Sequence, residues 1–136
     1  MADVEVYKDE NSLCFACSPR NPIGLKLTFE HDGDICRTRF TARPEHQGWN
    51  DVVHGGIVAT LLDEIMAQWI WAQGLITMTA EMTVRYSQSV PVGTELIVEG
   101  NPVSLKGRLI EMAARIILPD GTVAARASAK FLKVKK

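Results

Sequence analysis

The stretch from residue 57 to residue 71 constrains the fold more than any other part of the chain. Its apolar residues recur at the three- and four-residue intervals of a helix: Ile57, Val58, Leu61, Leu62, Ile65, Met66, Trp69 and Ile70. Alanines and a further tryptophan fill much of the remaining circumference, and a helix that is apolar nearly all round is a buried helix. Asp63, Glu64 and Gln68 interrupt the stretch, so it does not predict a membrane span. We therefore predict a central helix that ends near Gly74 and is covered by the rest of the chain.

Two carboxylates, Asp63 and Glu64, stand in the middle of this helix, where an unpaired charge is costly. Either they pair with a cation or reach solvent at a rim, or they take part in chemistry. The helix entry favours chemistry, because His54-Gly55-Gly56 lets the backbone turn tightly and the free N–H groups of a helix start suit an anion or a developing oxyanion. Asp63 follows about two turns later. An oxyanion site and a carboxylate on one element fit acyl transfer, with Asp63 activating water or attacking directly.

Strands are predicted on both sides of the helix. Alternating apolar and polar residues, bounded by glycine, proline and aspartate turns, predict strands over 24–31, 34–41, 77–88, 94–105, 108–118 and 122–133. The last of these places a run of alanines on one face, where a helix can approach closely. Because one helix must be covered on all sides, we predict an α+β domain in which an antiparallel β-sheet is wrapped around one long central helix.

Length and composition agree with a single domain over residues 1–136, in which 1–13 form a loosely held N-terminal arm or a short helix. A net charge of −1 gives no electrostatic case for nucleic acid or an anionic membrane as a partner. The N-terminus lacks the basic and apolar regions of a signal peptide, and three cysteines without such a signal favour reduced thiols. We therefore expect a cytoplasmic protein.

Cys14 and Cys17 form a Cys-x-x-Cys pair, which leaves three alternatives open. We favour structural thiols. A zinc site needs two more ligands, which Cys36, His31 or His46 would have to supply. A redox pair is the third alternative, although the prolines after Cys17 predict no helix of the thioredoxin kind.

A family resemblance rests on the same central motif. His54-Gly55-Gly56 with Asp63 nine residues after the histidine resembles the central helix of hotdog-fold acyl-CoA thioesterases, and most closely that of the phenylacetyl-CoA-type (PaaI-like) branch. The likeness runs from residue 14 to residue 131 and includes Asn-Pro-x-Gly-Leu at 21–25 and Val-Pro-x-Gly at 90–93. It implies the hotdog fold, hydrolysis of an acyl-CoA thioester, and a homodimer that assembles to a homotetramer. It implies no cofactor and no metal, because coenzyme A is part of the substrate.

The resemblance also assigns roles within the central motif. It makes Asp63 the general base or the nucleophile, and the Gly55 and Gly56 N–H groups the oxyanion donors. His54 then orients the loop or the thioester carbonyl, with a general base and a structural histidine as the alternatives. Thr79 helps to hold the water or the carboxylate, unless it is an ordinary surface threonine. In the family, the glycine loop of one subunit faces the aspartate of the other.

Other substrate contacts are less clearly marked. Gln47 and Asn50 flank the place where relatives position the thioester with a polar side chain, and Gly48 stands at that place here. Of the two, we favour Gln47. Lys106 and Arg108 flank a glycine and suit the phosphates of coenzyme A, although they also suit an ordinary solvated turn. Relatives often carry a basic residue before the later proline, where this chain has Ser-Gln-Ser at 87–89.

Two other functions stay open. One is a hotdog protein that binds acyl-CoA as a sensor or carrier without hydrolysing it. The other is a hydratase or dehydratase that acts on acyl thioesters, which we rank last because His54 lacks the acidic partner and local motif of that class. The sequence does not define the acyl chain, nor whether the carrier is coenzyme A or an acyl carrier protein.

Overall fold

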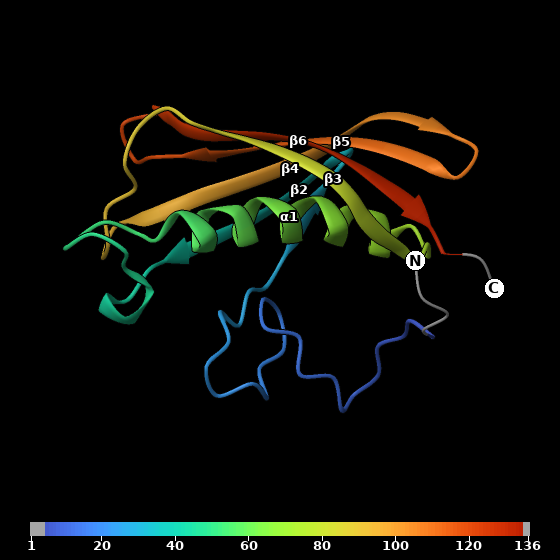
Figure 1. The fold of residues 1–136 in the computed structure, drawn as a ribbon, viewed down its shortest axis with the longest axis horizontal. Helices are drawn as coiled ribbons and strands as arrows, with labels where there is room; N and C mark the ends of the chain where they lie inside the picture. Colours follow the sequence, from blue (N-terminus) through green and yellow to red (C-terminus); the bar gives the residue numbers. More distant parts are fainter. Residues whose placement is uncertain (1–4, 135–136) are drawn as a thin grey trace.

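One long helix lies across one face of a six-stranded sheet in the computed structural model, which describes residues 5–134 (Figure 1). The helix is α1 (Gly55–Ala72), and a short 3-10 helix, Pro44–His46, precedes it. The strands are β1 (Glu30–Asp32), β2 (Ile35–Thr41), β3 (Thr77–Tyr86), β4 (Glu95–Lys106), β5 (Leu109–Ile117) and β6 (Val123–Lys133). Their order is β1-β2-β4-β5-β6-β3, and every neighbouring pair is antiparallel. This arrangement confirms the predicted hotdog fold.

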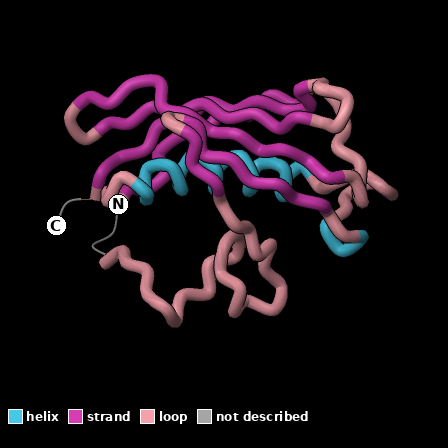
Figure 2. The backbone as a smooth tube through the Cα atoms, turned by 180° about the vertical axis from the view of Figure 1, so that it is seen from behind, coloured by secondary structure: helices cyan, strands magenta, loops and turns pink. Residues whose placement is uncertain are grey.

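The central helix is buried because it is covered on two sides. The sheet covers one side, and the irregular segment before β1 lies on the side away from the sheet (Figures 1 and 2). Apart from the half-buried Ile57, the apolar helix positions predicted from spacing are buried, and they include Leu61, Leu62, Ile65, Met66 and Ile70. No helix in residues 5–134 is long and apolar enough to cross a bilayer.

The helix approaches the sheet closely at Gly100 of β4. A Cβ atom built on Gly100 would lie 3.1 Å from Ile65 Cγ2 and 3.2 Å from the Ile65 carbonyl oxygen. The alanines of β6 were predicted to permit this approach, and Ala125, Ala127 and Ala129 are indeed buried. The position with no room for a methyl group, however, is in β4.

The predicted strand over 24–31 is wrong for most of its length, since only Glu30–Asp32 pairs with β2. The Leu25 N–H donates to the Phe15 carbonyl at 2.8 Å and the Leu27 N–H to the Ala16 carbonyl at 3.0 Å, while Lys26 between them has a φ of +55°. These bonds tie the segment to the N-terminal part of the chain. The predicted arm over 1–13 is described from residue 5 and forms no helix there, and residues 1–4 lie outside the described part.

A bulge in β3 alters the predicted alternation of side chains. The pairing of β3 with β6 shifts register between Thr79 and Glu81. Strict alternation along the strand predicted over 77–88 makes Thr79 face away from Met82 and Val84. Instead, Met82 and Val84 pack against the core and Thr79 also turns toward α1, because the extra residue reverses the alternation.

Candidate active site at the start of the central helix

The helix entry uses most of its own N–H groups. His54 is the N-cap, and its Nδ1 accepts a hydrogen bond from the Gly56 N–H at 2.8 Å. The N–H groups of Ile57 and Val58 both donate to the His54 carbonyl. Among the described residues, none accepts a hydrogen bond from the Gly55 N–H, and Gly55 is exposed. Of the two predicted oxyanion donors, the Gly55 N–H is therefore the one available to a ligand.

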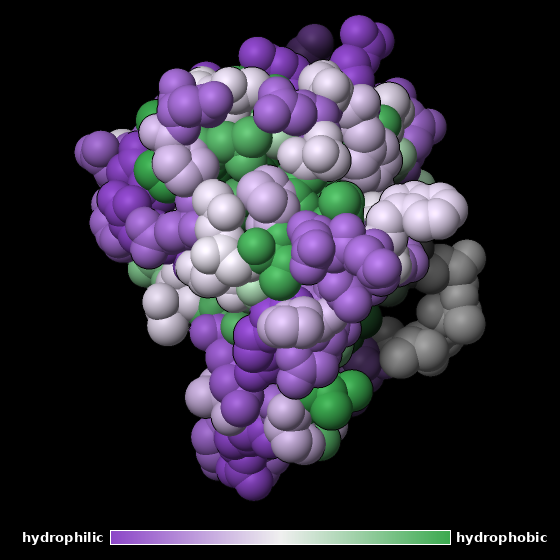
Figure 3. Space-filling model, turned by 90° about the vertical axis from the view of Figure 1, so that its left-hand side faces the viewer, coloured by the Kyte–Doolittle hydropathy of each residue, from purple (hydrophilic) through white to green (hydrophobic). Residues whose placement is uncertain are grey.

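Neighbouring strand ends fix this helix start in place. The Tyr86 hydroxyl, at the end of β3, donates to the Gly55 carbonyl at 2.7 Å. Before the helix, the Val53 N–H donates to the Val90 carbonyl at 2.8 Å. Figure 3 views the molecule from the end where α1 begins, and small apolar patches lie there among polar side chains. The hydrogen bond from Tyr86 to the helix start was not predicted from the sequence.

The loop before the helix leaves little room for a side chain at Gly48. A Cβ atom there would lie 3.2 Å from His54 Cα and 3.4 Å from His54 Cδ2. Gln47 instead shapes the loop, because its Oε1 accepts a hydrogen bond from the Asp51 N–H at 3.0 Å, where Asp51 has a φ of +64°. Asn50 is exposed on the same loop. The structure thus brings Gln47 and Asn50 near the helix entry.

Asp63 lies on the half-buried side of α1 that meets β3. Its Oδ1 accepts a hydrogen bond from the Thr79 hydroxyl at 2.7 Å, so the predicted neighbourhood of these two residues is present. None of the described residues donates a hydrogen bond to the other carboxylate oxygen. Asp63 follows Gly55 by eight positions in the helix, which at about 1.5 Å per residue amounts to about 12 Å along the helix axis.

Lys106 and Arg108 lie far from this helix entry. They flank the turn between β4 and β5, at the opposite end of the sheet from the start of α1 (Figure 1). Both are exposed, and an Arg108 guanidinium nitrogen donates to the Lys133 carbonyl at 3.2 Å. Within one chain, these cations and the His54 loop do not form a common site.

A second group of reactive side chains lies on the other side of the helix. Glu64 was predicted to be structural or to face solvent, and its exposure of 9% excludes the solvent-facing alternative. Its Oε2 lies 3.9 Å from Cys14 Sγ, and Lys8 Nζ lies 3.6 Å from Cys17 Sγ. Burial raises the pKa of the Cys17 thiol to about 12, with contributions from Cys14 and Glu64, and burial also raises the pKa of Glu64. Of the ligands suggested from sequence, none of Cys36, His31 and His46 belongs to this group.

The family comparison covers both the central helix, with most of the helix entry, and most of the sheet. The model of the thioesterase superfamily matches residues 50–125, more than half of the chain. The chain belongs to the thioesterase superfamily.

A curated relative is the acyl-coenzyme A thioesterase THEM4 of Rattus norvegicus, which is 28% identical over 89 residues. The match covers 65% of this chain and 38% of the relative, so the chain spans well under half of that protein.

Three solved structures have the same fold. The crystal structure of a thioesterase superfamily protein has a TM-score of 0.81 at 30% identity and covers 86% of this chain and 61% of that one. The PaaI protein of E. coli, from a phenylacetic acid degradation operon, has a TM-score of 0.76 at 16% identity, with 82% and 81% covered. A hypothetical thioesterase of Streptococcus pneumoniae with coenzyme A has a TM-score of 0.76 at 17% identity, with 81% and 90% covered. At 16% and 17% identity, the last two likenesses show the fold alone.

Proposed function

We propose that this chain hydrolyses an acyl-CoA thioester, with Asp63 as general base or nucleophile and the Gly55 N–H as oxyanion donor. The observation that carries the proposal is the 2.7 Å hydrogen bond from Thr79 to Asp63 Oδ1, which fixes the carboxylate and leaves its second oxygen for chemistry. The names of the THEM4 relative and of the coenzyme A complex support this choice of substrate. Two mutants of the Streptococcus pneumoniae protein replace a threonine and an aspartate that are sixteen residues apart, the spacing of Thr79 and Asp63 here.

In the general-base route, Asp63 takes a proton from water while the water oxygen attacks the acyl carbon. The carbonyl oxygen becomes an oxyanion that the Gly55 N–H stabilises. Collapse of the intermediate breaks the carbon–sulfur bond, and the departing thiolate receives the proton. In the nucleophilic route, Asp63 attacks the same carbon, the thiolate leaves, and water then hydrolyses the mixed anhydride. His54 positions the loop in both routes, because its Nδ1 is already bonded to the Gly56 N–H.

We further propose that each site contains residues of two copies of the chain. A carbonyl bound at the Gly55 N–H lies about 12 Å along the axis from Asp63 of the same helix, too far for a water held by that carboxylate. Strand β3 lies at an edge of the sheet, so a second copy can pair with it. Antiparallel pairing about the middle of β3 sets Thr79 of one copy opposite about residue 84 of the other, close to Tyr86 and therefore to Gly55.

The same pairing assigns a place to the two cations. Arg108 bonds to Lys133, and Lys133 pairs with Thr77 at the start of β3. That end of one copy adjoins the helix entry of the other, so Lys106 and Arg108 can reach the coenzyme A phosphates across the dimer. Gln47 and Asn50 would contact the thioester end. A tetramer of such dimers and a cytoplasmic location stay predictions.

The experiment is free-thiol release from a panel of short, medium, long and aryl acyl-CoA substrates. Wild type releases thiol, and Asp63→Asn loses most turnover while keeping its fold by circular dichroism. Glu95→Gln is the matched control, because Glu95 is an exposed carboxylate on β4 that pairs with Arg39. Saturable acyl-CoA binding without thiol release would replace this proposal with a sensor or carrier, and water loss from a 3-hydroxyacyl thioester would replace it with a dehydratase.

Gly55→Pro tests the oxyanion donor by itself. Gly55 is the first helical residue, where proline is well tolerated and removes only an N–H that the helix does not use. The preceding His54 has a ψ of 135°, which suits a residue before proline. We expect a loss of about 100-fold to 1,000-fold in turnover, as for removal of an oxyanion donor. Gly55→Ala is the control: it keeps the N–H, and its Cβ meets only ordinary contacts with Tyr86, the nearest at 3.6 Å.

A further inference from the structure

We propose that Cys14, Cys17 and Glu64 form a binding site for a thiophilic divalent metal ion such as Zn²⁺, which fastens the N-terminal segment to the central helix. One potential ligand atom from each residue lies within 4.8 Å of the others. Cys14 and Glu64 are fifty positions apart in sequence, so the fold and not a local motif brings them together. This site is separate from the Asp63 site and does not depend on the proposed hydrolysis.

The buried carboxylate is the observation that points to a ligand. Glu64 lies in the middle of α1 and is 9% exposed, yet it forms no salt bridge with any described residue. Its neighbours are two thiols, which are weak hydrogen-bond donors, and the Lys8 ammonium. Burial raises the pKa of Glu64, while the charge of Lys8 acts to lower it. Burying a carboxylate without an ion pair is costly, and a metal ion would supply a directly bonded positive charge.

The separation of Cys14 and Glu64 is close to that between two ligands of a tetrahedral zinc ion. Zinc lies about 2.3 Å from thiolate sulfur and about 2.1 Å from carboxylate oxygen, so a tetrahedral angle separates sulfur and oxygen by about 3.6 Å. Cys14 Sγ and Glu64 Oε2 are 3.9 Å apart, a few tenths of an ångström from that separation. The two thiolates select zinc over magnesium or calcium, which prefer oxygen ligands. A fourth position stays for water or a further ligand.

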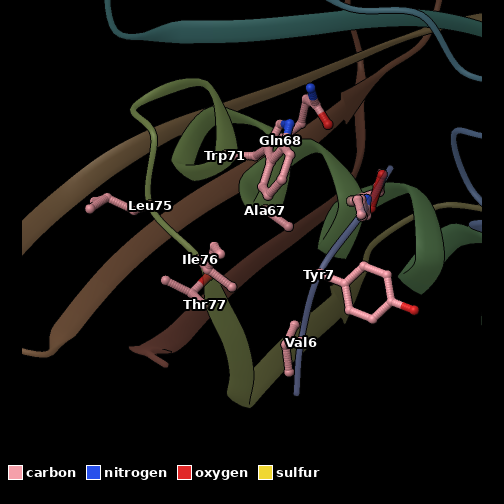
Figure 4. A pocket seen from close by; sticks show the side chains of 10 residues that line it. Val6, Tyr7, Ala67, Gln68, Trp71, Leu75, Ile76 and Thr77 are labelled. Atoms are coloured by element: carbon pink, nitrogen blue, oxygen red, sulfur yellow. The ribbon is translucent and has the colours of Figure 1, made fainter. Parts of the chain in front are cut away.

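Charge and access also favour the site. Two thiolates and one carboxylate carry three negative charges, which a divalent ion and the Lys8 ammonium together neutralise. Lys8 lies 3.6 Å from Cys17 Sγ and can donate to that sulfur from outside the metal. A pocket of about 90 Å³ opens beside Glu64, between the N-terminal segment and α1 (Figure 4). Trp71 and Gln68 line it from the helix, and Tyr7 lines it from the other side (Figure 4).

The test is titration of the reduced, chelator-treated full chain with Co²⁺ and Zn²⁺. Co²⁺ reports thiolate ligands by sulfur-to-metal charge-transfer absorption, and calorimetry with Zn²⁺ gives the stoichiometry. We expect one ion per chain and a higher Tm with Zn²⁺ than without it. Cys17→Ser should abolish the absorption. Glu64→Gln should weaken metal binding by at least about 10-fold to 100-fold, because loss of a residue that only hydrogen-bonds to a metal ligand already lowers the affinity by that factor. Cys36→Ala is the control, because Cys36 is a buried thiol outside the group.

Absence of binding in wild type would overturn the proposal. Unchanged affinity in Glu64→Gln would also overturn it, because the carboxylate would then not be a ligand. Loss of two hydrogen masses from the air-exposed chain, without metal binding after reduction, would assign Cys14 and Cys17 to a disulfide instead. Thiol release by the same variants, measured in parallel, keeps this result distinct from the proposed hydrolysis.

Discussion

His54 acts as a helix cap in the structure, and two substitutions separate that role from general-base catalysis. His54 Nδ1 accepts the Gly56 N–H at 2.8 Å. Asparagine carries Oδ1 on the same Cγ position, so His54→Asn keeps the acceptor and removes the imidazole. His54→Ala removes both. Because loss of an N-cap side chain costs about 1 kcal/mol, we expect His54→Ala to lower the free energy of unfolding by that amount.

The expected change in Tm follows from the size of the chain. For a domain of this length, a loss of 1 kcal/mol lowers Tm by roughly 3–5 °C. Urea denaturation and thermal melts at one protein concentration measure the change. His54→Asn should stay within a few tenths of a kcal/mol of wild type and keep most of its thiol release. If His54→Asn is as stable as wild type yet loses turnover as Asp63→Asn does, the capping role fails and the imidazole is part of the chemistry.

Three further predictions concern packing and protonation. Gly56→Ala should lower stability and Gly55→Ala should not, because a Cβ at 56 would lie 3.0 Å from His54 Nδ1. Gly100→Ala should cost about 1–3 kcal/mol in urea denaturation, since its Cβ would press on Ile65. Burial and then Arg43 lower the pKa of His46 below 6.5, so the unfolded chain binds a proton that the folded chain does not. The free energy of unfolding should therefore fall as pH drops below 6.5 toward the folded-state pKa, as urea denaturation between pH 7.5 and pH 5 can measure.

Each of these predictions has a result that contradicts it. Equal stability of Gly55→Ala and Gly56→Ala would mean that the His54 side chain can move away from residue 56 at no cost. A Gly100→Ala protein as stable as wild type would show that helix and sheet can separate by a few tenths of an ångström. For the pH effect, His46→Asn keeps an acceptor for the Arg43 N–H and should flatten the plot of unfolding free energy against pH. The control His31→Gln replaces an exposed histidine of β1 and should leave that plot unchanged. A profile unchanged by His46→Asn would assign the effect to another group.

The fold was largely predictable because its strongest signal is local. The apolar spacing between Ile57 and Ile70 predicts the buried helix directly, and alternation with glycine turns predicts most strands. The prediction of a strand over 24–31 was wrong because this segment contacts the N-terminal segment instead. The alternation of apolar residues alone does not distinguish such contacts from a strand. The bulge beside Thr79 was not predicted for a similar reason, since one extra residue in a strand leaves no mark in the sequence pattern.

The candidate site was predictable where a motif fixes it along the helix. The spacing of Gly55 and Asp63 follows from one element, whereas the Thr79–Asp63 hydrogen bond was suggested only by resemblance. The Cys14–Glu64 contact joins residues fifty positions apart and needs the packed chain. Glu64 in particular was placed at the surface or in a structural pair, because a carboxylate in an apolar helix gives no sign of which partner it meets.

The most direct test of the account is the thiol-releasing activity of a mixed dimer. Asp63→Asn and Gly55→Pro chains are each expected to lose nearly all activity alone. Co-refolding them in equal amounts yields some mixed dimers, which contain one chain of each variant. In a mixed dimer, one site of the two contains an intact Gly55 and an intact Asp63. Random pairing then restores about a quarter of wild-type activity, because half of the dimers are mixed and each has one working site. Recovery to that level would support hydrolysis at a site shared by two copies. No recovery, with mixed dimers present by mass spectrometry, would contradict it.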